Sequence, residues 1–116
     1  RSDNQYTGTT TVRQGTLRLS QPTGLAIRGP LVVGGFGTAA TVIETVGNQI
    51  ADTSPVTVNA LGTFDLNGLT DTIGNLAVNG TGQVFTRTSG NLTTGTITMV
   101  GGTITVGNNG TLTSGT

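Results

Sequence analysis

The acidic residues are the side chains of this sequence that are most capable of chemistry. The chain has 116 residues and five carboxylates, Asp3, Glu44, Asp52, Asp65 and Asp71. Two carboxylates in one groove can act as the acid and base of a glycosidase or lyase, and parallel β-helices host such enzymes. However, the chain has no histidine, lysine or cysteine to serve as a partner base or nucleophile. We therefore expect solvated carboxylates or corner hydrogen bonds. The sequence predicts a protein that is not an enzyme and has no catalytic, cofactor-binding or metal-binding residue.

A glycine-rich stretch at residues 35–40 superficially matches a dinucleotide-binding turn. That turn needs a following helix and an acidic residue about 20 positions later. Residues 41–43 are strand-like instead, and no acid stands at the required place. The stretch is also similar to the glycine-rich calcium repeat of secreted β-rolls, but Thr38 replaces the metal-binding aspartate. A corner between strands explains this stretch better.

Threonines on alternate residues form the most regular polar pattern. Flat ladders of such pairs can bind ice, but these pairs are spaced as if on different faces, and we do not expect ice binding. Three Asn-x-Thr acceptor patterns, at 79–81, 91–93 and 109–111, make glycan attachment an open alternative. The threonine pairs are Thr96/Thr98, Thr103/Thr105 and Thr111/Thr113.

A repeated five-residue motif, Gly-Thr-apolar-polar-apolar (the Gly-Thr phrase), must position the acidic and threonine side chains. It starts at Gly15, Gly62 and Gly102, with looser copies at Gly95 and Gly110. Each copy is a glycine corner followed by a short strand whose alternate residues are apolar, as in a strand with one buried face. In two of the copies Arg18 and Asp65 stand at equivalent positions, so both are expected to project from the same outer face.

The spacing of the phrase predicts an all-β chain wound as a parallel β-helix, or β-solenoid. The close copies are 7 or 8 residues apart, which fits one face of a coil of about 20 to 24 residues. The distant copies then lie two coils apart, and the chain forms roughly five coils. Residues 1–116 are predicted to be a single solenoid module. Because the chain starts at Arg1, we expect a segment or repeating unit of a larger extracellular assembly.

The alternation also predicts which side chains point inward. The least regular region is expected at residues 21–53, and Asn67, Asn75, Asn108 and Asn109 are expected at corners. The expected inward residues are Val12, Leu17, Leu19, Leu25, Ile27, Val42, Ile50, Val56, Val58, Phe64, Leu66, Ile73, Leu76, Val78, Val84, Leu92, Ile97, Met99, Ile104, Val106 and Leu112.

Charge excludes several classes of partner. The formal net charge is zero and the five basic residues are scattered arginines, so no nucleic-acid footprint is present. The sequence has neither a basic amphipathic stretch nor an apolar run long enough for a bilayer, so we expect no membrane insertion.

Several stretches resemble the autotransporter-associated β-strand repeat, also called the passenger-associated transport repeat. The opening of that repeat resembles residues 6–12 and 15–17 of this chain. Its middle section resembles residues 48–54, 56–58, 64–68 and 72–76. The resemblance extends from about Asn4 to Leu112. It implies a right-handed parallel β-helix in a large bacterial surface protein, where such repeats serve as stalk and display structure.

Neither terminus shows a capping helix or a charged or proline-rich cap, and we therefore expect uncapped ends. Bare solenoid ends recruit further chain. The expected partners are covalent neighbouring repeats or identical copies stacked head to tail, which would build a filament or fibril. The sequence thus predicts a structural module of an extracellular or cell-surface stalk, passenger or fibre. The alternative is a carbohydrate-binding or adhesive module that uses a hydroxyl-rich lateral face, although the chain has few aromatic residues for a sugar platform.

Overall fold

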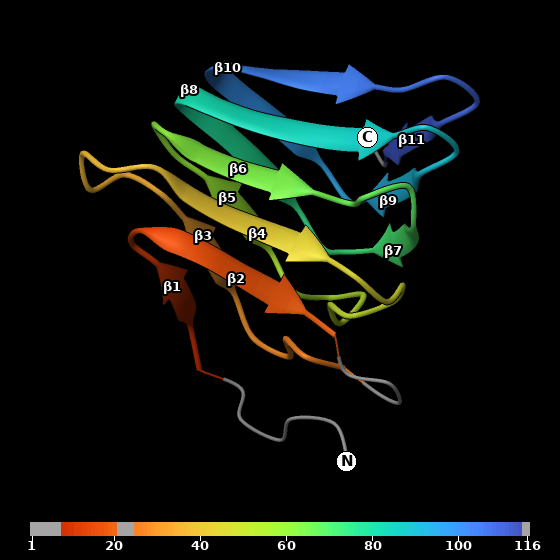
Figure 1. The fold of residues 1–116 in the computed structure, drawn as a ribbon, viewed down its shortest axis with the longest axis horizontal. Coiled ribbons are helices and arrows are strands. Elements are labelled where there is room, and N and C mark those ends of the chain that lie inside the picture. Colours follow the sequence, from red (N-terminus) through yellow and green to blue (C-terminus); the bar gives the residue numbers. More distant parts are fainter. Residues whose placement is uncertain (1–7, 21–24, 115–116) are drawn as a thin grey trace.

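The computed structural model describes residues 8–20 and 25–114 of the chain. The described residues form strands and no helix, and the strands wind around one axis (Figure 1). In chain order the strands are β1 (Thr10–Val12), β2 (Gly15–Leu19), β3 (Leu31–Val33), β4 (Ala40–Glu44), β5 (Val56–Val58), β6 (Gly62–Asp65), β7 (Thr70–Thr72), β8 (Leu76–Arg87), β9 (Asn91–Thr94), β10 (Ile97–Val106) and β11 (Thr111–Ser114).

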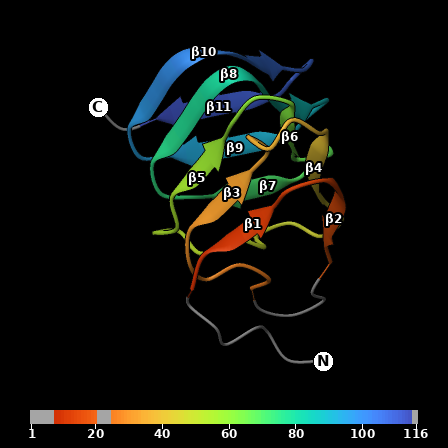
Figure 2. The ribbon, with the colours of Figure 1, turned by 90° about the vertical axis from the view of Figure 1, so that its left-hand side faces the viewer.

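The strands form three faces, and every pairing between coils is parallel. The first face consists of β1, β3, β5 and the first parts of β8 and β10. The second face consists of β2, β4, β6 and the later parts of β8 and β10. The third face consists of β7, β9 and β11. Figure 2 shows successive coils stacked one above another. This arrangement confirms the predicted parallel β-solenoid.

The length of each coil follows from the pairing register on the first face. The stacked Cα partners, from one coil to the next, are Thr10, Leu31, Val56, Leu76 and Ile97. Each coil therefore takes 20 to 25 residues, and the chain makes about five turns, as predicted.

The glycine corners occupy the predicted places. Gly15 pairs with Ala40, and Ala40 pairs with Gly62, so the first two strict copies of the phrase lie two coils apart. At Gly102 the backbone has a φ of 78°, and an added Cβ would lie 2.7 Å from the carbonyl oxygen of Gly82. Because the corner passes this close to the preceding coil, a side chain there would force the backbone to shift.

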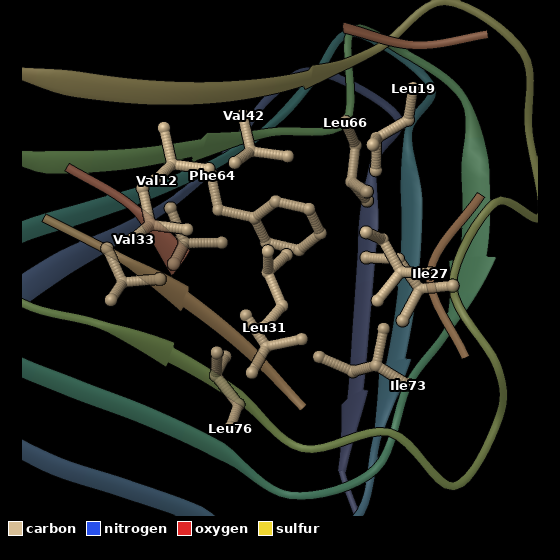
Figure 3. Packing of buried hydrophobic residues seen from close by; sticks show 14 of the residues in the cluster. Val12, Leu19, Ile27, Leu31, Val33, Val42, Phe64, Leu66, Ile73 and Leu76 are labelled. Carbon is tan, nitrogen blue, oxygen red and sulfur yellow. The ribbon is translucent and has the colours of Figure 1, made fainter. Parts of the chain in front are cut away.

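The interior of the coils is filled by alternate apolar side chains from all three faces (Figure 3). Most of the expected inward residues are buried. Four further residues are buried that were not expected to point inward: Ala26, Leu31, Val33 and Ala40. The buried core residues are Val12, Leu19, Ala26, Ile27, Leu31, Val33, Ala40, Val42, Ile50, Val56, Val58, Phe64, Leu66, Ile73, Leu76, Val78, Val84 and Leu92.

Two expected core residues are exposed because they belong to the last described coil. Met99 is 45% exposed and Val106 is 43% exposed. Met99 pairs in register with the buried Val78 of the preceding coil, so it does lie in an inward position. In the described part of the chain no further coil covers it. Four other expected core residues are partly buried and pack against the core: Leu17, Ile97, Ile104 and Leu112.

The region expected to be least regular contains two strands and is otherwise irregular, as predicted. It contains β3 and β4, which both pair fully with neighbouring coils. Outside these two strands, residues 25–30 and 45–53 contain only the isolated bridge between Ile27 and Ile50, and residues 34–39 form a loop. Residues 21–24 lie outside the described residues. Among the asparagines expected at corners, Asn67 and Asn109 have positive φ angles of 55° and 59°.

Candidate functional site

Some of the carboxylates are buried, although solvated carboxylates or corner hydrogen bonds were expected. Asp52 is exposed, which agrees with the prediction, and Asp3 lies outside the described residues. Glu44 and Asp71, however, are completely buried. The prediction of solvated charges is therefore wrong for these two residues.

Strand alternation explains why both acids point inward. In β4 the buried residues are Ala40, Val42 and Glu44, and in β7 the buried residue is Asp71. The Cα partner of Asp71 in the next coil is the buried Leu92. Each acid thus occupies a position that neighbouring coils fill with an apolar side chain, and burial there requires compensating hydrogen bonds.

Asp71 obtains those bonds from the backbone of the preceding coil. Its Oδ2 accepts the backbone N–H groups of Gln49, at 2.9 Å, and Ile50, at 3.1 Å. Both residues lie outside any named strand, and Ile50 makes an isolated bridge to Ile27. The Asp71 carboxylate therefore accepts the backbone N–H groups that a neighbouring strand would otherwise accept, at the place where the third face has no regular strand.

Glu44 completes the arrangement as a protonated carboxyl group. Burial raises the pKa of Glu44 to about 11, and a hydrogen bond to Asp71 and the charge of Asp71 act in the same direction. Burial also raises the pKa of Asp71, whereas hydrogen bonds from Glu44 and from backbone N–H groups lower it. With this pKa, Glu44 keeps its proton at neutral pH next to Asp71. Because both side chains have no exposed surface, a substrate cannot contact the pair.

Asp65 is held in an ion pair on the second face. Its Cα lies in one column with Arg18, Ile43 and Phe85, which confirms that Arg18 and Asp65 share a face. The carboxylate accepts hydrogen bonds from Arg87 Nε, at 3.1 and 3.2 Å, and Nη2, at 2.9 Å. It is therefore buried rather than freely solvated.

Asp65 also makes a corner hydrogen bond of the expected kind. Its Oδ1 accepts the backbone N–H of Asn67 at 2.8 Å. The residue thus joins the left-handed corner at Asn67 to the guanidinium group of the next coil.

A shallow groove lies beside this ion pair. The Arg87 guanidinium carbon is 4.3 Å from the centre of the Phe85 ring, within the range of a cation–π contact. The hydrogen bond to Asp65 raises the pKa of Arg87. The groove has a volume of about 370 Å³ and is lined by Phe85, Arg87, Thr88, Thr105, Gly107 and Asn108.

The threonine pairs lie on three different faces, as predicted. Thr98 is on the first face, Thr103 and Thr105 are on the second, and Thr111 and Thr113 are on the third. The column through Thr103 is also interrupted, because its Cα partner in the preceding coil is Gln83. A flat ladder of hydroxyl groups is therefore not formed by these pairs.

The last described coil presents apolar side chains at the end of the solenoid. Met99 and Val106 are 45% and 43% exposed there. Within the described residues, β10 pairs with β8 and β11 pairs with β9, and the opposite edges of β10 and β11 have no strand partner. We call β10 and β11 with these apolar residues the end surface. A paired-strand edge with apolar inward positions is a template for another coil.

In comparisons with known proteins, the chain matches no protein-family model, no curated protein and no solved structure. No group of three or more acidic, histidine or cysteine side chains that could hold a metal ion occurs in residues 8–20 and 25–114. The same residues contain no helix long and apolar enough to cross a membrane.

Proposed function

We propose that this chain is a non-enzymatic structural module of a bacterial extracellular stalk, passenger or fibre. Its coils extend a solenoid, and further coils stack on its ends, either from covalent neighbouring repeats or from other copies. The resemblance to the autotransporter-associated repeat supports the bacterial surface location. Antibody labelling of intact source cells tests that location, and signal confined to broken cells would contradict it.

The end surface is the observation that carries this proposal. Met99 lies above the buried Val78, and Ile104 lies above the buried Val84. These positions continue columns that are apolar and buried in the preceding coil. A further coil would bury them as each coil buries the one before it, at about 25 cal/mol for each Å² of apolar surface removed from water.

A chain of two copies joined head to tail tests the extension. If coils continue across the joint, small-angle X-ray scattering will show one rod of doubled length, and the two copies will unfold in a single transition at a raised temperature. The matched control carries Val106→Arg in the first copy alone, which places a charge in the joint. Two particles that move independently and melt like the single chain would contradict the proposal.

A second function, carbohydrate binding, is favoured by the groove beside Phe85. Phe85 is partly buried, and exposed Thr105 and Asn108 supply a hydroxyl and an amide next to the ring. Because Asp65 neutralises Arg87, the groove suits a neutral sugar ring better than an anion. A glycan array tests this proposal, with binding expected to be lost in Phe85→Ala and kept in Phe36→Ala. Equal binding by both variants would place any sugar site elsewhere.

A further inference from the structure

We propose that the end surface binds the β1–β2 edge of a second copy, in the register that places Gly15 over Gly102. This inference rests on the proposed structural function and specifies its partner. The two copies stack in parallel, head to tail, and the first coil of one copy acts as the sixth coil of the next.

The register follows from the columns of the solenoid. On the first face the column that starts at Val12 runs through Val33, Val58 and Val78 to Met99. A second copy that continues this column places its own Val12 over Met99. Both ends of the column are valine or methionine, so the stack remains apolar.

On the second face the same shift aligns the two ends residue by residue. The first coil reads Gly-Thr-Leu-Arg-Leu from Gly15, and the last coil reads Gly-Thr-Ile-Thr-Val from Gly102. Leu17 then lies over Ile104, and both residues are only partly buried and pack against the core. Stacking removes the remaining surface of both side chains from water.

The corners at the two ends match in length and in the φ of their last residue, although Gly101 has a φ of 91° and Gln14, at the equivalent place, has no positive φ. Two residues lie between Val12 and Gly15, and two lie between Met99 and Gly102. The φ angles of Gly15 and Gly102 are 79° and 78°. Two coils with equal corners can keep both faces in register, whereas unequal corners require a bulge at the joint.

The surroundings of the corner glycines indicate what is missing beside the first coil. A Cβ added at Gly62 would lie 2.4 Å from the Val33 carbonyl oxygen, and one at Gly82 would lie 2.6 Å from that of Val58. Each of these contacts comes from the preceding coil. A Cβ added at Gly15 would meet no atom of the described residues within 4 Å, and a second copy would supply the preceding coil at this corner.

Charge favours the head-to-tail arrangement over pairing of two β1–β2 edges. β1, β2 and the corner between them carry Arg13 and Arg18, whereas β10 and β11 carry no charged residue. Two β1–β2 edges facing each other would bring arginines together. The head-to-tail register instead places Arg18 over Thr105, which creates no repulsion.

Cysteine cross-linking tests the register directly, because the chain has no cysteine of its own. Thr16 and Thr103 become adjacent outward residues across the proposed joint. Neighbouring strands are about 4.8 Å apart, within the Cα separation of about 4.4 to 6.8 Å that a disulfide bridges. Within one copy the two residues are four coils apart, about 19 Å by the same spacing, so they cannot cross-link internally.

The double variant Thr16→Cys/Thr103→Cys is expected to give a ladder of oligomers on oxidation that collapses on reduction. An equal mixture of the two single variants is expected to give mainly heterodimers. The control pair Thr16→Cys/Thr111→Cys places the second thiol on the third face and is expected to give at least a tenfold lower yield of oligomers. Equal ladders from both pairs would reflect random collisions and would overturn the register.

A second variant separates failure of the joint from failure of the fold. Val106→Arg is expected to abolish the oligomers while leaving the circular dichroism spectrum unchanged, because Val106 is already exposed in one copy. The matched Val32→Arg change, on a partly buried outward residue of β3, is expected to keep them. If the unmodified chain stays monomeric at millimolar concentration and Thr16→Cys/Thr103→Cys gives no cross-linked oligomers, a second copy is not the partner. The joined two-copy chain would then still report independently on the proposed structural function.

Discussion

The Glu44 carboxyl group lies beside the Asp71 carboxylate inside the solenoid, where burial and the charge of Asp71 both raise the pKa of Glu44. Asp71 in turn accepts two backbone N–H groups from the coil next to it. The pair therefore connects β4 on the second face, β7 on the third face and the irregular segment at Gln49. Such a bridge is stable only while Glu44 holds its proton, and this makes the fold sensitive to pH.

The free energy of unfolding is predicted to fall as the pH rises. The pKa of Glu44 is raised from 4.5 to about 11, so between these values the folded state holds one proton more than the unfolded state. The loss is up to about 1.4 kcal/mol per pH unit, and the raised pKa of Asp71 acts in the same direction. Urea unfolding from pH 4 to pH 10 measures this slope. Stability that stays level or increases over this range would contradict the shared proton.

Replacing Glu44 with glutamine is predicted to reduce this pH dependence. The amide keeps a hydrogen-bond donor for Asp71 and cannot ionise. The variant should match the unmodified chain near pH 4.5 and exceed its stability above pH 8. Asp52→Asn, which changes an exposed acid, serves as the control and should leave the slope unchanged. If Glu44→Gln retains the full slope, another group is responsible.

Replacing Asp71 with leucine is predicted to destabilise the chain, even though the next coil has Leu92 at this position. The substitution leaves the N–H groups of Gln49 and Ile50 without an acceptor, at about 1 to 3 kcal/mol for each group. Asp71→Asn retains one acceptor oxygen and should lose less. Chemical denaturation at pH 5 compares the two variants, and equal stability would mean that these N–H groups find other partners.

Aspartate substitutions in the core are predicted to differ by coil. Leu66 is fully buried in the middle of the stack, so Leu66→Asp should prevent cooperative folding because it buries an unpaired charge. Ile104 is partly buried in the last described coil, so Ile104→Asp should lower the melting temperature without unfolding the other coils. Arg18→Ala, at an exposed outward position, should change stability by no more than about 0.5 kcal/mol. Thermal melts followed by circular dichroism distinguish these outcomes, and comparable damage by Arg18→Ala would show that the faces are misassigned.

The regular part of the fold was predictable because it is encoded locally. In the Gly-Thr phrase a corner residue and the alternation of the next strand are adjacent in sequence, so Gly62 and Phe64 could be placed without knowing what lies beside them. Leu31 and Val33 were missed because they belong to an unbroken apolar run with no alternation, followed by a glycine-rich loop. Their inward direction is set by pairing with β1 and β5.

The buried acids could not be predicted with the same rules. The alternation of Ala40, Val42 and Glu44 does place Glu44 inward, but a carboxylate normally remains in water, and that preference favoured an outward position. Burial is possible because Glu44 keeps its own proton next to Asp71. It also depends on Gln49 and Ile50, which lie about one coil from Asp71 in the sequence. Contacts between residues of different coils leave no recognisable pattern in the sequence of β4 or of β7 alone.

The constant length of the coils has a consequence for folding. Each strand of the first face pairs with one that precedes it by only 20 to 25 residues. The entropic cost of closing each loop, about (3/2)RT ln n for n residues, is therefore nearly the same for every added coil. A chain emerging from a ribosome or crossing a membrane could wind one turn at a time onto the turn already formed, without waiting for its far end.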